Sequence, residues 1–151
     1  MSQSTPGNSP FANLIQIGVV VKDMDQAIKR FSALGIGPFY SKTPPRTAKS
    51  LFRGKPFVSA DRVKIMAAQL GNCELELIQP LDGESPHKEY LDSKGEGIQH
   101  IAFAVDNLDE AVEKLKAEGS EVLLEGRRVD GTGVTYLDLD AAGVIVELVK
   151  H

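Results

Sequence analysis

The chain of 151 residues contains a single cysteine, Cys73. One cysteine cannot form an internal disulfide, and it cannot supply a zinc site built from several cysteines. No apolar run approaches the roughly 18 residues that a membrane-spanning helix needs. The first ten residues, MSQSTPGNSP, lack both the basic start and the apolar stretch of a secretory signal. We therefore expect a cytoplasmic protein with no membrane partner.

The chain also lacks an excess of positive charge. It has 17 Lys and Arg against 21 Asp and Glu, a net charge of −4 and a pI near 5.4. A general nucleic-acid binder needs a basic face, so we expect no nucleic-acid partner. Hydrophobic residues make up 42% and charged residues 25%, which is typical of a folded chain the size of one domain.

The sequence contains an internal repeat. Residues 15–35 (IQIGVVVKDMDQAIKRFSALG) align without a gap on residues 99–119 (QHIAFAVDNLDEAVEKLKAEG). Each stretch has a strand-like apolar run, a short polar turn and then apolar residues at helical spacing. The matching positions include Ile17 and Ile101, Val21 and Val105, Ala27 and Ala111, Phe31 and Leu115, and Gly35 and Gly119. The repeat indicates a duplicated strand–helix unit.

Both units have the sequence of a capped helix. Asp23 is followed three residues later by Gln26, and Asn107 by Glu110. This spacing allows a capping box, in which the two side chains satisfy free backbone N–H groups at the start of the helix. A glycine closes each unit, because glycine tolerates the left-handed conformation at a helix end.

A second pair of matching strands follows the helices. LELIQ (75–79) resembles VELVK (146–150), and each carries a glutamate within an apolar run. The first half is longer, and we expect its excess, within 37–73, to be loop because proline and glycine interrupt it. We predict a mobile tail over 1–11 and one domain over 12–151. Its two modules span about 13–80 and 97–150, and a short helix near 85–94 joins them.

Four polar residues interrupt these predicted strands: Gln16, Glu76, His100 and Glu147. Taken singly, a strand glutamate usually faces water, and a strand glutamine or histidine is usually a hydrogen-bonded core residue. The repeat changes this interpretation, because Gln16 matches His100 and Glu76 matches Glu147. A pseudo-twofold relation would bring all four together, and two carboxylates at one place favour a bound divalent cation.

The paired halves and these four positions resemble the vicinal oxygen chelate superfamily, which includes glyoxalase I, methylmalonyl-CoA epimerase, extradiol dioxygenases and bleomycin-resistance proteins. The resemblance covers about 13–150. Two stretches are most similar to methylmalonyl-CoA epimerase, namely ELELIQPLDGESPHKEYLDSKGEGIQHIAFAVDNLDEAVEKL and GVIVELV. The resemblance implies an α+β fold in which two tandem βαβββ modules form a cupped mixed sheet. It also implies one divalent metal ion in the cup, a small-molecule substrate and a homodimer.

On this resemblance, the metal ligands are Gln16, Glu76, His100 and Glu147, and the metal is Zn, Ni, Co or Mn. The implied activity is that of a lyase or isomerase, which moves a proton next to a metal-polarised carbonyl of a thioester or hemithioacetal. Glu147 is the first candidate for the catalytic base, and Glu76 is its partner on the opposite side.

The chain departs from both named enzymes. Epimerases usually have histidine at the position of Gln16. The set Gln/Glu/His/Glu matches eukaryotic-type glyoxalase I, which usually carries an arginine where this chain has Val20. The second glutamate base of epimerases has no counterpart, and Asp61 is the nearest acid. We assign no role to His87, which we expect on a surface helix.

Three interpretations therefore stay open. The first is a metal-dependent lyase or isomerase of the glyoxalase I/methylmalonyl-CoA epimerase type. The second is an enzyme of the same superfamily that acts on another 2-oxo or thioester substrate. The third is a non-catalytic small-molecule binding protein of the bleomycin-resistance type.

Overall fold

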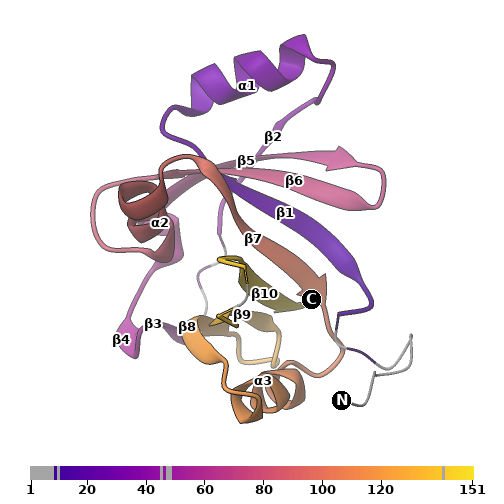
Figure 1. Cartoon of the computed structure of the whole chain (residues 1–151), viewed down its shortest axis with the longest axis vertical. Coiled ribbons are helices and arrows are strands. Elements are labelled where there is room, and N and C mark those ends of the chain that lie inside the picture. The colour runs from indigo at the N-terminus through magenta and orange to yellow at the C-terminus, as the bar shows by residue number, and fades with distance from the viewer. Residues whose placement is uncertain (1–8, 10, 45, 47–48, 141) are drawn as a thin grey trace.

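The computed structural model describes residues 9, 11–44, 46, 49–140 and 142–151 (Figure 1). Its strands form one mixed sheet, and its helices lie outside that sheet. In chain order the elements are β1 Leu14–Val20, α1 Met24–Ala33, β2 Tyr40–Lys42, β3 Lys49–Phe52, β4 Lys55–Pro56, a 3-10 turn Ser59–Asp61, β5 Val63–Leu70, β6 Cys73–Pro80, α2 Pro86–Lys94, β7 Gly97–Ala104, α3 Leu108–Ala117, β8 Glu121–Arg127, β9 Gly133–Asp138 and β10 Ile145–Lys150.

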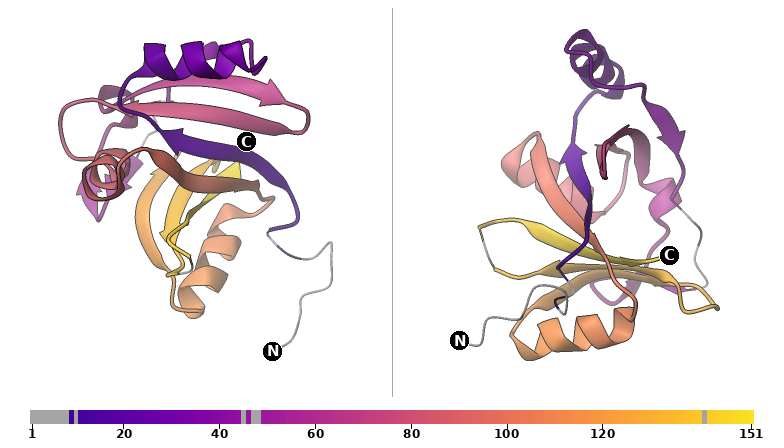
Figure 2. Two further views of the ribbon diagram at one scale, coloured as in Figure 1. Left: turned by 45° about the horizontal axis from the view of Figure 1, so that its top comes forward. Right: turned by 90° about the vertical axis from the view of Figure 1, so that its right-hand side faces the viewer.

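The order of the strands repeats about the centre of the sheet. It is β2-β5-β6-β1-β7-β10-β9-β8-β3-β4. β1 and β7 meet as an antiparallel pair, β6 lies parallel to β1, and β10 lies parallel to β7. The predicted α+β fold with two βαβββ modules is confirmed. The sheet curves into a cup that does not close on itself (Figure 2).

The prediction that the extra residues within 37–73 are loop was wrong. This segment contains β2, the β3–β4 hairpin and all of β5. β3 leaves the first module and pairs antiparallel with β8 of the second. The strands are short and lie among prolines and glycines, and the partner of β3 is far away in the sequence, so no local pattern indicates the pairing.

The helix ends follow the sequence closely. The side chain of Asp23 accepts a hydrogen bond from the backbone N–H of Gln26, and that of Asn107 accepts one from Glu110. The helix expected near 85–94 is α2, and Ser85 caps it by accepting from the N–H of Lys88. These side chains satisfy backbone donors that would otherwise lack partners at the first turn of each helix.

Each long helix covers the outer face of its own module. Met24 of α1 packs with Val21 and Leu77, whereas Leu108 of α3 packs with Leu137 and Leu148. In Figure 1, α1 lies beyond β5 and β6, and α3 lies on the opposite side of the molecule. Because neighbouring residues of a strand point to opposite faces, residues next to these apolar ones are turned into the cup.

The predicted mobile tail lies largely outside the described residues. Phe11, at its end, packs edge-on against Phe103 with 5.0 Å between the ring centroids. In the described part of the chain, none of the helices has the length and apolar character that crossing a bilayer requires.

Candidate active site

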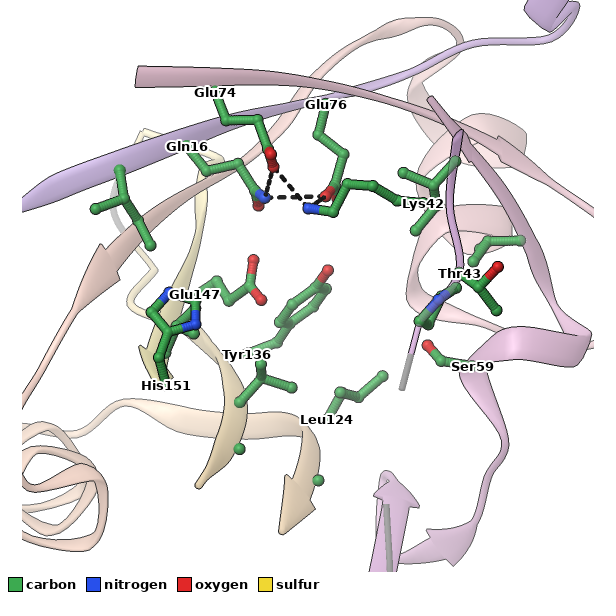
Figure 3. Close-up of a pocket in the computed structure, with 18 of the residues that line it drawn as sticks. Gln16, Lys42, Thr43, Ser59, Glu74, Glu76, Leu124, Tyr136, Glu147 and His151 are labelled. Atoms are coloured by element: carbon green, nitrogen blue, oxygen red, sulfur yellow. Dashed lines mark hydrogen bonds and ion pairs between the residues drawn. The ribbon is translucent and has the colours of Figure 1, made fainter. Parts of the chain in front are cut away.

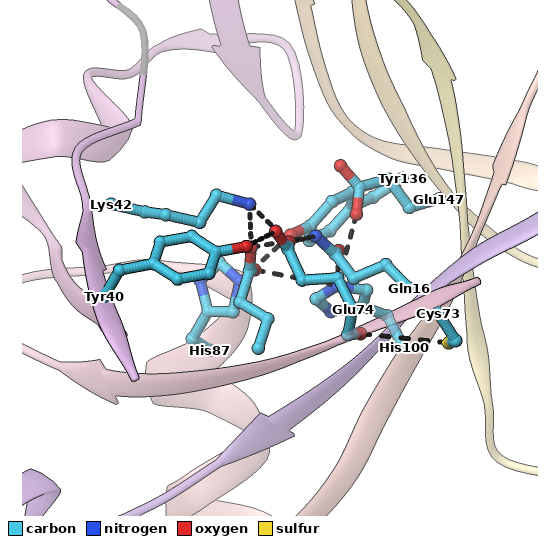
Figure 4. Close-up of polar contacts among 10 residues, drawn as sticks. Gln16, Tyr40, Lys42, Cys73, Glu74, His87, His100, Tyr136 and Glu147 are labelled. Atoms are coloured by element: carbon cyan, nitrogen blue, oxygen red, sulfur yellow. Dashed lines mark hydrogen bonds and ion pairs between the residues drawn. The ribbon is translucent and has the colours of Figure 1, made fainter. Parts of the chain in front are cut away.

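The structure brings the four predicted polar residues together. Nε2 of His100 lies 2.9 Å from Oε1 of Gln16, 3.2 Å from Oε2 of Glu147 and 4.0 Å from Oε1 of Glu76. All four side chains are buried. They come from four neighbouring strands of the sheet, two in each module. Figure 4 shows three of them, Gln16, His100 and Glu147, pointing towards one another.

Small residues make this convergence possible. Gly18 of β1 lies opposite both His100 of β7 and Glu76 of β6. Ala102, which is the equivalent of Gly18 in the repeat, lies opposite both Gln16 and Glu147. A larger side chain at either central position would fill the space into which the polar residues point.

Three members of the polar cluster, Gln16, Glu76 and Glu147, line a cavity of about 540 Å³ (Figure 3). Both modules contribute to its lining. The first supplies Gln16, Lys42 and Glu76, and the second supplies Tyr136 and Glu147. A cavity of this size accommodates a small-molecule ligand, and its few polar groups lie together, as is typical of a binding site.

His100 is surrounded by hydrogen-bond acceptors on both ring nitrogens. Nδ1 lies 2.8 Å from Oε1 of Gln99, and Nε2 faces Oε1 of Gln16 and the carboxylate of Glu147. Burial alone would lower the pKa of His100, but the hydrogen bond to Glu147 and the negative charges of Glu147 and Glu76 together outweigh burial and raise it. The imidazole therefore needs a proton or a cation at Nε2 while Nδ1–H donates to Gln99.

The structure reveals a cation that the sequence analysis missed. Nζ of Lys42 lies 2.6 Å from Oε1 of Glu74 and 2.8 Å from Oε2 of Glu76. Tyr40, on the same face of β2, also donates to Glu74. Burial lowers the pKa of Lys42, but attraction to Glu76 and hydrogen bonds to Glu74 and Glu76 raise it more, so the pKa lies above its ordinary value. Lys42 is therefore a fixed positive charge.

The charges of the cluster suit a divalent cation. Glu74, Glu76 and Glu147 bring three negative charges, and Lys42 balances one of them. Two negative charges remain, and a divalent cation bound at Nε2 of His100 would balance them. Among the described residues, the buried Oε2 of Glu147 makes no hydrogen bond of good geometry, and its contact is with Nε2 of His100 at 3.2 Å, so a cation between the two could take this oxygen as a ligand.

As the side chains stand, no group of three or more His, Cys, Asp and Glu residues in the described part of the chain has the spacing of a metal site. The reason is the position of Glu76, whose Oε2 contacts both Lys42 and Nε2 of Gln16. Oxygen and nitrogen donors of this kind could hold a metal ion if Glu76 turned from Lys42 towards His100. Burial raises the pKa of Glu76, and repulsion by Glu147 raises it further.

His87 is not on the surface. It is buried, it lines the cavity, and its Nε2 lies 3.2 Å from the hydroxyl of Tyr136. Burial, together with His100, lowers the pKa of His87 to about 3, so the ring is neutral near pH 7. Burial also raises the pKa of Tyr136 well above 10. The sequence carried no indication of this pair, because α2 lacks an apolar stripe.

The structure does not support Asp61 as a second base. Asp61 is half-exposed, pairs with Arg46 at 2.9 Å, and is not among the residues that line the cavity. Val20 is completely buried in the sheet and does not line the cavity either. The acidic group that faces Glu147 across the cup is Glu76.

A model of the glyoxalase/bleomycin resistance protein/dioxygenase superfamily matches residues 15–136. The chain belongs to this superfamily. Among curated members, it is 29% identical to the mitochondrial methylmalonyl-CoA epimerase of Bos taurus over 152 residues, which cover 96% of this chain and 79% of the bovine protein.

Solved structures of the superfamily share this fold. A methylmalonyl-CoA epimerase from Mycobacterium tuberculosis matches with a TM-score of 0.70 at 23% identity, covering 99% of this chain and 92% of that protein. A variant of the Streptomyces coelicolor methylmalonyl-CoA epimerase, solved with 2-nitronate-propionyl-CoA, matches with a TM-score of 0.68 at 24% identity. That match covers 91% of this chain and 96% of the Streptomyces chain.

Proposed function

We propose that the chain is a divalent-metal-dependent epimerase that moves the acidic proton next to the carbonyl of a small acyl-CoA thioester, of which methylmalonyl-CoA is the first to test. The observation that carries this proposal is the carboxylate of Glu147. It is buried at the wall of the cavity, and among the described residues its Oε2 makes no hydrogen bond of good geometry and faces Nε2 of His100 at 3.2 Å. A carboxylate in this state is a competent base for a substrate C–H group.

An epimerase must remove a proton from one face of a carbon and return it to the other. Glu147 belongs to the second module and Glu76 to the first, so the two carboxylates approach the cavity from different walls. In the proposed reaction, Glu147 accepts the proton, the C–H electron pair passes to the enolate, and Glu76 delivers a proton to the opposite face. Glu76, which is counted as ionised in the charge balance of the resting site, must first take up that proton from solvent, and its raised pKa favours this uptake.

The metal would be held by Oε1 of Gln16, Glu76, Nε2 of His100 and Glu147, and by its charge it would polarise the carbonyl oxygen of the substrate. Gln99 keeps the imidazole in the correct orientation by accepting from Nδ1. Three oxygen donors and one nitrogen suit Zn, Ni, Co or Mn. The homodimer and the cytoplasmic location stay predictions.

The test is solvent deuterium incorporation at C2 of methylmalonyl-CoA. The protein is loaded with Co²⁺, Ni²⁺, Mn²⁺ or Zn²⁺, and a sample stripped with a chelator is the control. We expect exchange that depends on metal, and about one retained metal ion per chain by elemental analysis, which is lost in His100→Ala. Metal-loaded, folded protein that exchanges no faster than buffer would overturn the epimerase proposal.

A second candidate is a lyase acting on a hemithioacetal. Gln16 favours it, because the set Gln/Glu/His/Glu resembles that of eukaryotic-type glyoxalase I. The buried Val20 counts against it, since no arginine occupies that position to bind a glutathione carboxylate. The hemithioacetal of methylglyoxal and glutathione is assayed in parallel. Thioester binding without exchange or turnover would instead support a binding protein of the bleomycin-resistance type.

A further inference from the structure

His87 and Tyr136 form a polar pair at the wall of the cavity that the proposed reaction does not use. His87 lies in the first turn of α2, and Tyr136 lies on β9, directly opposite Glu147 of β10. The ring of Tyr136 lies against His100 with 5.1 Å between centroids and against His87 with 5.7 Å. The pair is therefore next to both the proposed base and the histidine ligand.

The hydrogen bonding of the pair is incomplete. Nε2 of His87 contacts the Tyr136 hydroxyl at 3.2 Å, whereas Nδ1 is buried with no partner among the described residues. If Tyr136 donates across this contact, the N–H at Nδ1 is unused. If His87 donates, the O–H of Tyr136 is unused. A protonated ring would leave still more donors. In every case one donor hydrogen of the pair has no partner among the described residues, and both residues line the cavity.

Lys42 adds a positive charge to the same part of the cavity. Two of the three ammonium hydrogens are used by Glu74 and Glu76. In Figure 3, the hydroxyl of Tyr136 points towards the side of the cavity where Lys42 lies. The cup is lined with carboxylates, so an anionic ligand needs hydrogen-bond donors and a positive charge there. The neutral donor of the pair and the ammonium group of Lys42 supply these to an anionic oxygen.

We propose that His87 and Tyr136 donate a hydrogen bond to the free carboxylate of the substrate's acyl group, with Lys42 supplying the charge, so that the site selects thioesters of dicarboxylic acids over thioesters of simple fatty acids. This inference rests on the proposed function, because it needs a thioester in the cavity. It assigns the acyl specificity to a pair of residues outside the four ligand positions.

Calorimetric binding of methylmalonyl-CoA and of propionyl-CoA, which lacks the carboxylate, tests the subsite on Co²⁺-loaded protein. For Tyr136→Phe we expect roughly 10- to 100-fold weaker binding of methylmalonyl-CoA, the loss typical of a hydrogen bond to a charged group. Propionyl-CoA binding is expected to stay within about threefold of the original protein, because no bond to it is removed. His87→Phe is expected to change the preference in the same direction.

Thr135→Val is the matched control, since it removes a buried hydroxyl from the neighbouring position of β9, which faces away from the cup. It should leave both affinities unchanged. The subsite is overturned if Tyr136→Phe weakens the two thioesters equally, weakens neither, or if the original protein does not prefer methylmalonyl-CoA. Deuterium exchange judges the epimerase proposal separately, so failure of one is distinguishable from failure of the other.

A spectroscopic readout tests the contact directly. The chain has three histidines, so selective ¹⁵N labelling gives few ring signals. Methylmalonyl-CoA, but not propionyl-CoA, should shift the ring nitrogens of His87, and Tyr136→Phe should abolish the difference. Unchanged His87 signals on saturation with methylmalonyl-CoA would also overturn the subsite.

Discussion

Gly18 lies directly against the imidazole of His100: a β-carbon on Gly18 would stand 2.0 Å from Cε1 of the ring. No rotamer of an alanine methyl avoids this overlap, because the β-carbon is fixed by the backbone. We therefore expect Gly18→Ala to cost at least about 2 kcal/mol of unfolding free energy, as overpacked cores do, and to abolish metal retention. Urea unfolding and elemental analysis measure the two effects.

The clash can be isolated with a double-mutant cycle. In the background of His100→Ala the ring is absent, so Gly18→Ala should then cost much less than in the original chain. Equal costs in both backgrounds would show that the position is sensitive for another reason, such as a change in the β1–β7 pairing.

Lys42 and the metal compete for the same carboxylate. Nζ of Lys42 contacts Oε2 of Glu76 at 2.8 Å, and a nearby positive charge opposes a second cation. We expect Lys42→Met to bind Co²⁺ about tenfold more tightly or better, measured by competition with a chelating dye. Lys64→Met, which changes an exposed lysine on β5, is the control and should not alter the affinity. Weaker Co²⁺ binding by Lys42→Met would contradict the competition.

Replacing the proposed base tests the chemistry without changing the shape of the site. In Glu147→Gln the side chain keeps its size but cannot accept the substrate proton. Deuterium exchange into methylmalonyl-CoA should fall by about 10²- to 10⁴-fold, the usual contribution of a positioned base. Glu113→Gln, on the exposed face of α3, should leave the rate unchanged. A rate in Glu147→Gln within about threefold of the original would assign the base elsewhere.

His87 makes the stability of the protein depend on pH. Its pKa in the folded chain is about 3, below the ordinary value of 6.5, because burial disfavours the charged ring. Between these values the unfolded chain binds a proton that the folded chain does not, so stability falls as the pH drops. From about pH 7.5 to pH 5 we expect a loss of about 2 kcal/mol from this residue, which urea unfolding would detect.

His100 acts in the opposite direction, since its raised folded pKa contributes stability at low pH that is lost as the pH rises. The contribution of His87 is therefore measured as a difference. Between about pH 7.5 and pH 5, His87→Phe should lose about 2 kcal/mol less unfolding free energy than the original protein. If the unfolding free energy of both proteins depended on pH in the same way, the His87 ring would take up a proton in the folded chain.

The residues that could be predicted from the sequence are those related by the repeat. Gln16 and His100 occupy equivalent positions, and so do Glu76 and Glu147, so symmetry indicates that they meet. The direction of each glutamate also follows from its strand, since its neighbours pack under α1 or α3. Strand periodicity and helix caps act over a few residues and can be read locally.

The contributions of Lys42 and His87 could not be predicted, because they depend on pairing between distant elements. Lys42 reaches Glu74 and Glu76 because the short strand β2 pairs with β5, which pairs with β6. His87 enters the cavity because α2 packs against β6, β1 and β7, which brings its first turn within reach of Tyr136 of β9. A helix without an apolar stripe gives no indication of which side will be buried.

The hairpin of β3 and β4 has a consequence for the second module. β8 would otherwise be an outer strand with a row of unpaired backbone groups, and such an edge is a template for self-association. The hairpin covers that edge with residues supplied by the first module. Residues 97–150 expressed alone would therefore expose β8, and in the whole chain the hairpin guards this edge against aggregation.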